Sequence, residues 1–311
     1  MGRFITRRLL TALPVLLLVS LITFGLIQLV PGDPATVIAG QDASPAELAR
    51  VREMLQLDAP WYDRLLAWYG RLAQGDLGQS FTLGRSVATA IMERAPVTFS
   101  LAAFALVMTL AIGMTIGIAA ALRQNSWLDA ALMGFALVGV SLPNFWLGIM
   151  FILVFAVELG WLPSGGYVGP EESVAGWLRC LVLPALSLAL LQMGLLARIT
   201  RASMIEVLRQ DYVRTARAKG LPAWKVVGKH ALRNVLVPVV TVIGIIFSLL
   251  LAGAVVIETV YSIPGIGRLV VAGIARRDYP VIQGALLLIA TSCVLLNIVV
   301  DILYAYIDPR V

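Results

Sequence analysis

Charged side chains are scarce in this chain of 311 residues. Asp, Glu, Lys and Arg together make up 14% of the sequence, whereas roughly 25% is usual in soluble domains. A soluble fold would need a charged surface that this composition cannot supply, and a disordered chain would need low hydrophobicity with high charge. Both classes are therefore excluded, and the apolar share of 59% favours a helical bundle embedded in a lipid bilayer.

Residue types that carry catalytic or metal chemistry are also few. The chain has one histidine, His230, and two cysteines, Cys180 and Cys293, which form no CxxC pair. Because no Cys/His pair, Ser/His/Asp set or ligand cluster falls at a useful spacing, the sequence predicts no metal site and no catalytic residue. A phosphate-binding loop would end in Gly-Lys-Ser/Thr, but the only lysine that follows a glycine, Lys229, precedes His230. We therefore expect no bound cofactor and disfavour an integral-membrane enzyme.

Long charge-free runs predict the architecture. A transmembrane helix needs about 20 predominantly apolar residues, and six runs of about that length contain no charged side chain. These runs are residues 9–32, 95–122, 130–157, 180–197, 234–257 and 279–300. We expect an all-α integral membrane protein in which residues 1–311 form one domain with six transmembrane helices. Since the span interiors hold no ionisable side chain, ion-coupled transport is disfavoured.

The distribution of basic residues predicts the orientation. Fourteen Lys and Arg residues adjoin the spans on one side of the membrane, nine of them within residues 198–233, and four adjoin the spans on the other side. Short loops rich in Lys and Arg face the cytoplasm. We therefore expect both termini and the 198–233 segment to be cytoplasmic, and residues 33–94 to lie outside. The same bias explains the pI of 9.6 without nucleic-acid binding, for which no motif is present.

The outer segment, residues 33–94, carries two helix patterns. Ser44 and Glu47 form a capping box around Pro45, which predicts a helix start. A second helix is expected near Pro60, because one apolar face repeats at helical spacing. That face consists of Trp61, Leu65, Trp68 and Leu72. Such faces pack onto the bundle or the lipid headgroups, and docking of an external partner is the alternative.

Small residues recur at every fourth position in two spans, which lets helix backbones approach closely in lipid. They are Thr109, Gly113, Gly117 and Ala121 in the second span and Gly244, Ser248 and Ala252 in the fifth. Packing within the chain is favoured over contact with another subunit. The amide of Asn144, which follows Pro143 inside the third span, is expected to bond to a neighbouring helix.

The cytoplasmic segment contains an expected helix–turn–helix elbow. A short helix from Asp211 should end at Gly220, because glycine accepts the left-handed conformation of a helix C-terminus. Pro222 should then start a second helix, since proline suits the first helical position. Two such helices joined at a glycine could act as a lever on the membrane spans. The alternative is a basic loop that binds anionic lipid at the membrane interface.

The sequence of this cytoplasmic segment resembles that of a known protein family. Residues 215–220, Thr-Ala-Arg-Ala-Lys-Gly, and 230–234, His-Ala-Leu-Arg-Asn, resemble the coupling loop of ATP-binding-cassette (ABC) importer permeases. The general Glu-Ala-Ala pattern of that loop is replaced here by Arg214, Thr215 and Ala216, a departure typical of the dipeptide and oligopeptide permeases. Further segments look like the first of the two permease subunits of such transporters. They are residues 7–9, 31–34, 75–78, 264–268, 277–281 and 308–310, so the resemblance covers the chain in order.

The resemblance implies a transport subunit of the bacterial cytoplasmic (inner) membrane that catalyses no reaction itself. It implies as partners a second, homologous permease, two cytoplasmic ATPase subunits that bind ATP and Mg, and an extracytoplasmic solute-binding protein. The solute could be a dipeptide, a longer peptide, glutathione or a nickel complex. A secondary transporter or channel that is not driven by ATP is the alternative.

Two groups of residues are candidates for a site. The implied ATPase-coupling residues are Asp211, Tyr212, Arg214, Thr215, Ala216, Lys219, Gly220, Pro222 and Trp224. The candidates for the solute pathway are Asn144, Ser248, Glu258, Pro264 and Gly265, the last two in a turn expected at the outer mouth.

Overall fold

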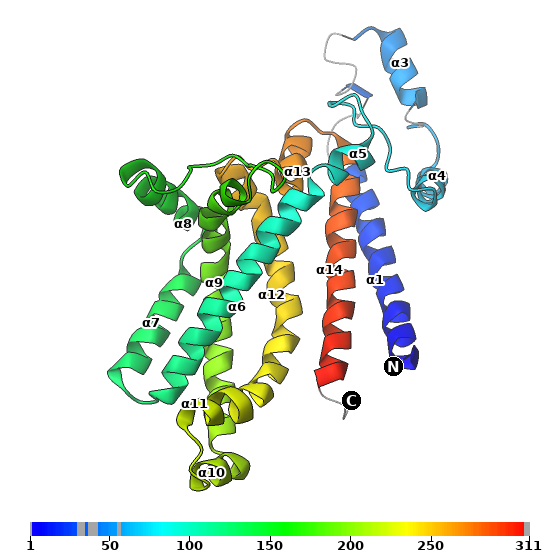
Figure 1. The fold of residues 1–311 in the computed structure, drawn as a ribbon. Coiled ribbons are helices and arrows are strands. Elements are labelled where there is room, and N and C mark those ends of the chain that lie inside the picture. The colour runs from blue at the N-terminus through cyan, green and yellow to red at the C-terminus, as the bar shows by residue number, and fades with distance from the viewer. Residues whose placement is uncertain (1, 30–34, 37–42, 55–56, 308–311) are drawn as a thin grey trace. The chain divides into compact units, whose positions relative to one another are not determined.

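The computed structural model describes residues 2–29, 35–36, 43–54 and 57–307, and this part of the chain is predominantly helical with no named β-strand. The fold divides into two compact units. We call residues 1–96 and 265–294 the terminal unit, and residues 97–264 and 295–311 the central unit. Figure 1 labels the helices of both.

The terminal unit contains the expected outer helices. Its helices are α1 (Gly2–Leu29), α3 (Pro45–Met54), α4 (Trp61–Ala73), α5 (Val87–Met92), α13 (Ile266–Ala275) and the start of α14 (Tyr279–Ile307). The capping box is confirmed, because the Ser44 backbone N–H donates to Glu47 Oε2 at 2.8 Å and the Glu47 N–H donates to Ser44 Oγ at 3.3 Å. These bonds from Ser44 hold the pKa of the Glu47 carboxyl below its ordinary value.

Helix α4 begins after Pro60, as expected, and packs on α1 through its aromatic face. The ring of Trp68 is buried 5.9 Å from that of Phe24, and the Tyr69 hydroxyl is 2.7 Å from Ser20 Oγ. Trp61, at the start of the same face, is 62% exposed. The C-terminal half of this face therefore packs onto another helix of the chain, as expected, while its first residue does not.

The central unit is a bundle built around one long helix, α9 (Val174–Leu208), which contacts the helices on both sides of it. The other elements are α6 (Ala95–Leu122), α7 (Trp127–Ser141), α8 (Asn144–Phe151), the π-helix η1 (Ile152–Glu158), α10 (Asp211–Ala218), α11 (Ala223–Lys225), the π-helix η2 (Val226–Ala231) and α12 (Leu232–Val260). Helices α6, α7, α9 and α12 run alongside one another in Figure 1.

Glycines allow α6, α7 and α9 to pack at close range. The predicted stripe in α6 is buried along its length, from Thr109 to Ala121. A Cβ at Gly117 would lie 2.6 Å from the Ala197 carbonyl oxygen of α9, and a Cβ on Gly194 of α9 would overlap the backbone of α7. Packing within the chain is thus confirmed for the second span. In α12 only Gly244 of the second stripe is buried, where it faces the Asn297 side chain.

The run 130–157 does not form one straight helix, and here the prediction is wrong. Helix α7 ends at Ser141, and the pair α8–η1 continues at an angle of 103° to it. The break follows from Pro143, which lacks a backbone N–H and disfavours helical geometry in the preceding residue. Leu142 accordingly has extended backbone angles, φ −94° and ψ 134°.

Within the described residues, four helices are long and apolar enough to cross a bilayer, and five if the bent pair is one span. The apolar part of α1, Leu10–Gly25, falls among the shorter apolar helices. Two of the four extend into the segment expected as a cytoplasmic loop, because α9 continues to Leu208 and a helix runs without a gap over Ala223–Val260. That segment is therefore mostly helical, with α10 between the two long helices.

Candidate functional site

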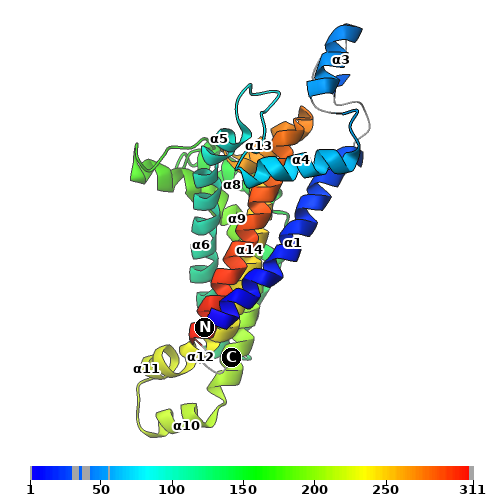
Figure 2. The same cartoon turned by 90° about the vertical axis from the view of Figure 1, so that its right-hand side faces the viewer.

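All nine predicted coupling residues lie in one stretch, residues 210–231, which we call the elbow. The elbow comprises α10, the turn at Gly220, α11 and η2, and it joins the ends of α9 and α12. Both views of the central unit place α10 beyond the ends of the long helices, and α11 lies nearer to those ends than α10 does (Figures 1 and 2). The structure thus brings these candidates together at one end of the bundle.

The turn at the centre of the elbow is a complete helix C-cap. Gly220 has φ +74°, its N–H donates to the Arg217 carbonyl at 2.9 Å, and the Leu221 N–H donates to the Ala216 carbonyl at 3.3 Å. This pair of bonds is the Schellman motif. Pro222 then adopts extended angles and precedes the first residue of α11. The predicted helix end at Gly220 is confirmed, and the next helix starts one residue after Pro222.

An apolar cluster fixes α10 to its neighbours. Val213 and Val226 are 0% and 1% exposed and pack with Ala216, Leu208 and Leu221. A hydrogen bond of 2.6 Å from Asn234 Nδ2 to the Tyr212 hydroxyl oxygen ties α10 to the start of α12 as well. The helix is therefore held on both of the long helices that it connects.

The opposite face of the elbow is open to solvent. Trp224 is 71% exposed and Tyr212 is 42% exposed, although both are large and partly apolar. Asp211 and Arg214 form an exposed ion pair at 3.5 Å, and the Thr215 hydroxyl donates to the Asp211 carbonyl. Lys219 ends α10. Exposed aromatic side chains interleaved with charges are typical of a surface that docks a partner.

The five pathway candidates are not gathered in the same way. Asn144 begins α8 and is half-buried, and the Ser248 hydroxyl donates to the Gly244 carbonyl of its own helix. Glu258 is fully buried and accepts a hydrogen bond of 2.6 Å from the Thr98 hydroxyl of α6. Pro264 is exposed and Gly265 is buried, immediately before α13. Helix α13 itself was not expected, since residues 264–268 suggested only a turn.

Sequence reasoning missed an ion pair near the elbow. Arg201 of α9 donates two hydrogen bonds of 2.7 Å to the carboxylate of Asp129 in α7, and the Asn125 N–H donates to the same carboxylate. This bidentate pair fixes the start of α7 against α9. The partners are 72 residues apart, and both stand outside the charge-free runs where spans were sought, so no local signal links them.

A second missed contact involves Tyr261, directly after α12. Its buried hydroxyl donates to the Gly148 carbonyl of α8 at 3.0 Å and lies 3.1 Å from the Ser187 hydroxyl of α9. Tyr261 therefore joins three helices at the end of the bundle opposite the elbow.

Comparison with known proteins identifies the family. A family model described as "Binding-protein-dependent transport system inner membrane component" matches residues 113–311, and a model described as the N-terminal part of such components matches residues 1–102. The chain belongs to this family. It is a multi-pass inner-membrane permease subunit of an ABC importer, a transport component without catalysis of its own, and the resemblance is confirmed. Membership of this family excludes the alternative of a transporter or channel that is not driven by ATP.

Relatives match over the full length. A putative peptide transport system permease protein of Brucella abortus is 50% identical over 311 residues, which are 100% of this chain and 99% of the relative. The dipeptide transport system permease protein DppB of Alkalihalophilus pseudofirmus is 43% identical and covers 98% of each chain. The glutathione transport system permease protein GsiC of Escherichia coli is also 43% identical, over 100% of this chain and 99% of the relative.

Among solved structures, a chain of the MetNI methionine ABC transporter in an inward-facing conformation is similar in fold. The TM-score is 0.59 at 17% identity, over 70% of this chain and 95% of the other.

Proposed function

We propose that this chain is one of two permease subunits of an ABC importer that carries di- or oligopeptides or a related small solute into the cytoplasm. The names of the full-length relatives support this solute class, because they include peptide, dipeptide and glutathione permeases. The sequence segments that look like the first permease subunit support its place beside a second, homologous permease.

We propose that transport is driven through the elbow. Helix α10 presents an exposed face while its other face is packed on α9 and η2 through Val213 and Val226. A partner that displaces α10 must therefore also move the long helices to which it is joined. We assign this partner as a pair of cytoplasmic ATPase subunits, which bind ATP and Mg, whereas an extracytoplasmic binding protein delivers the solute. The coupling residues are those of the elbow, from Asp211 to Trp224.

For the membrane topology we propose six membrane segments with both termini in the cytoplasm. The third segment, residues 130–157, is broken at Pro143, and α1 supplies the first. The bias of basic residues supports this orientation, which puts the elbow inside and residues 33–94 outside. Asn144, Ser248, Glu258, Pro264 and Gly265 are proposed to face the solute pathway.

Reconstitution tests the proposal. The chain is co-expressed with the permease, ATPase and binding-protein genes found beside its own gene, and the complex is placed in proteoliposomes with labelled dipeptide, tripeptide or glutathione. Uptake should require ATP and persist when an uncoupler abolishes ion gradients, and the chain by itself should hydrolyse no ATP. Uptake that the uncoupler stops, or that proceeds without the ATPase subunits, would contradict the proposal.

Cysteine labelling tests the orientation separately. A cysteine at position 219 should react with an impermeant reagent only from the cytoplasmic side. A cysteine at position 74, in the segment after α4, should react only from outside. The reverse pattern would overturn the topology and leave the solute assignment untouched.

A further inference from the structure

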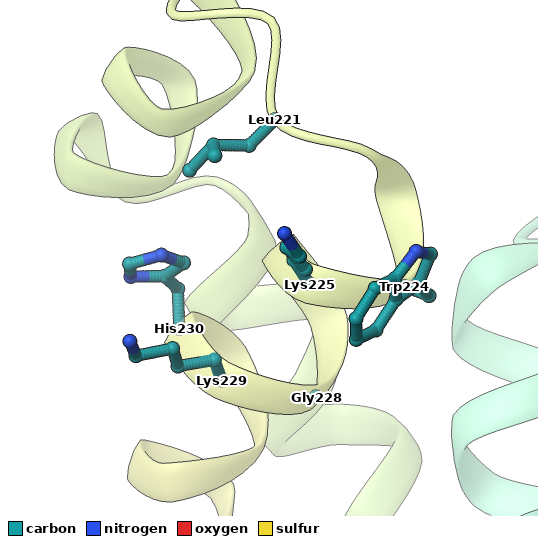
Figure 3. Close-up of a pocket in the computed structure, with 6 residues that line it drawn as sticks. All are labelled: Leu221, Trp224, Lys225, Gly228, Lys229 and His230. Carbon is teal, nitrogen blue, oxygen red and sulfur yellow. The ribbon is translucent and has the colours of Figure 1, made fainter.

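The end of the central unit opposite the elbow carries a feature that ATPase coupling does not explain. The hollow beside Trp224 is part of the elbow itself, because all of its lining residues lie within residues 210–231 (Figure 3). At the other end, α8 and η1 leave α7 at an angle of 103°. We call residues 144–158, which form these two elements, the arm.

The joint between α7 and the arm has the properties of a hinge. Leu142 and Pro143 both have extended backbone angles, with ψ of 134° and 136°. Pro143 has no N–H that could bond to a carbonyl of α7. Hinges are typically a few residues at the ends of elements, which absorb a change in backbone angles.

The arm is held mainly at its start. Helix α8 has two buried residues, Leu147 and Gly148, and η1 has none. Within the described residues, a single hydrogen bond ties the arm to a residue distant in sequence, from the Tyr261 hydroxyl to the Gly148 carbonyl at 3.0 Å. The Tyr261 ring packs against Gly148, where a Cβ would lie 3.2 Å from ring carbon Cε2.

This hydrogen bond can break without leaving a buried group unpaired. The Gly148 carbonyl also accepts from the Ile152 N–H. The Tyr261 hydroxyl lies 3.1 Å from Ser187 Oγ, a second acceptor. The Ser187 hydroxyl uses its own proton on the Leu183 carbonyl at 2.8 Å, so its oxygen remains able to accept. Because a buried polar group is costly mainly when it has no partner, release of the arm costs little in hydrogen bonding.

We propose that the arm is a hinged lid on this end of the central unit and that Tyr261 is its latch. In the latched state the Tyr261 hydroxyl donates to the Gly148 carbonyl, and in the released state it donates to Ser187 Oγ. Release turns the arm about Leu142 and Pro143 and uncovers the ends of α9 and α12 that α8 contacts. The latch depends on contacts within this chain alone, whereas its use as an outer gate rests on the proposed function.

The experiment measures the distance between the arm and α7 in the full-length chain, reconstituted in lipid nanodiscs. Spin labels are attached to Gly134→Cys, where open space surrounds the Cβ position, and to Val157→Cys, where the native side chain is 65% exposed. Cys180 and Cys293 are replaced by serine. Leu147→Ala is included in every sample, because loss of this buried contact raises the released population. Double electron–electron resonance then gives the ratio of released to latched chains.

Two variants should change this ratio in opposite directions. Tyr261→Phe removes the latch bond and leaves no group unpaired, so it should raise the ratio roughly 2- to 10-fold, the net contribution of one hydrogen bond. Ser187→Ala removes the second acceptor and leaves the released hydroxyl unpaired, so it should lower the ratio roughly fivefold or more. The matched control is Tyr167→Phe, whose hydroxyl accepts from Trp177 Nε1 instead, and it should leave the ratio unchanged.

Three results would overturn the latch. One is a single, unchanged distance in all variants, and another is an equal shift in Tyr167→Phe. The third is a shift in the same direction in Tyr261→Phe and Ser187→Ala, which would show general loosening and no exchange of acceptors.

Use of the arm as a gate is tested in the complex with the partner subunits. The ratio should differ between the nucleotide-free complex and the complex with vanadate-trapped nucleotide. Equal ratios in the two states would overturn the gate. The measurements on the chain alone need neither ATPase nor solute, so a failure of the proposed function would leave them unchanged.

Discussion

Gly220 holds the turn of the elbow in a backbone conformation that side-chain-bearing residues rarely adopt. Its φ of +74° is in the left-handed region, and a Cβ built there meets nothing within 4 Å. A substitution therefore costs backbone strain alone, roughly 1–2 kcal/mol for an ordinary residue. That cost corresponds to a roughly 5- to 30-fold shift between the capped turn and conformations in which α10 is released.

Three variants at Gly220 test this geometry, and a fourth tests what the turn contacts. Asn tolerates the left-handed region, so Gly220→Asn should lose least, Gly220→Ala should lose more, and the β-branched Gly220→Val should lose most. ATP-driven uptake in proteoliposomes should fall in that order. Hydrogen exchange at the Leu221 amide, which donates to the Ala216 carbonyl in the cap, should accelerate in the same order.

Gly220→Asp adds a test of what the turn contacts. Asp has nearly the shape and backbone preference of Asn and differs by its charge, so both should form the turn to a similar extent. If the turn docks on an ATPase subunit, Gly220→Asp should abolish uptake and weaken co-purification of that subunit beyond the effect of Asn, while insertion in the membrane stays normal. Equal behaviour of the two would refute the docking.

The control for this series is Gly134→Ala in α7. Gly134 has open space around its Cβ position and no positive φ, so alanine should be neutral or slightly stabilising there. Wild-type uptake and exchange in Gly220→Val, or a loss of the same size in Gly134→Ala, would refute the reasoning that backbone strain at the elbow uncouples transport.

Three further predictions concern packing and polar contacts. Gly117→Val should lower the thermal unfolding midpoint, because its Cβ would lie 2.6 Å from a carbonyl oxygen of α9 and overpacking costs about 1–3 kcal/mol. An unchanged midpoint would mean that α6 is not closely packed. Arg201→Gln should lower the free energy of unfolding by about 1–3 kcal/mol, because the buried Asp129 carboxylate loses both hydrogen bonds from Arg201. Adding Asp129→Asn should recover most of this loss. Additive losses in the double variant would show that the pair is not coupled. Asp278→Ala should speed hydrogen exchange at the Thr82 amide, which donates to the buried Asp278 carboxylate at 3.0 Å. Exchange as slow as in the wild type would mean that this hydrogen bond does not hold the segment around Thr82.

Features with a local cause could be predicted from the sequence. The cap at Gly220 depends on the backbone freedom of one residue, and the capping box depends on Ser44 and Glu47, three positions apart. The small-residue stripe of α6 depends only on periodicity along one helix. The elbow, which combines such local signals, was therefore predicted in place, and its residues lie together as expected.

Features that depend on long-range contacts could not be predicted. Asp278 is such a case, because its carboxylate accepts hydrogen bonds from the hydroxyls of Ser80 and Thr82, nearly 200 residues earlier. The 103° break in the run 130–157 has a local cause at Pro143, but it was missed because apolar run length reports hydrophobicity and not helix direction. The pathway candidates stand on different elements, with Asn144 at the start of α8, Ser248 and Glu258 on α12 and Gly265 before α13, so no local pattern relates them.

The strength of the apolar cluster under α10 bears on how the elbow could transmit a force. Complete burial of a valine contributes roughly 1.5–3 kcal/mol, and Val213 and Val226 are both almost completely buried at the junction of α10 with η2. Separating α10 from its base would thus cost several kcal/mol, even before the Tyr212–Asn234 hydrogen bond is counted. Typical coupling free energies between two sites are only about 1–3 kcal/mol. A displacement of α10 by a partner therefore costs less if the ends of α9 and α12 move with it than if α10 detaches, so the elbow should behave as one rigid body.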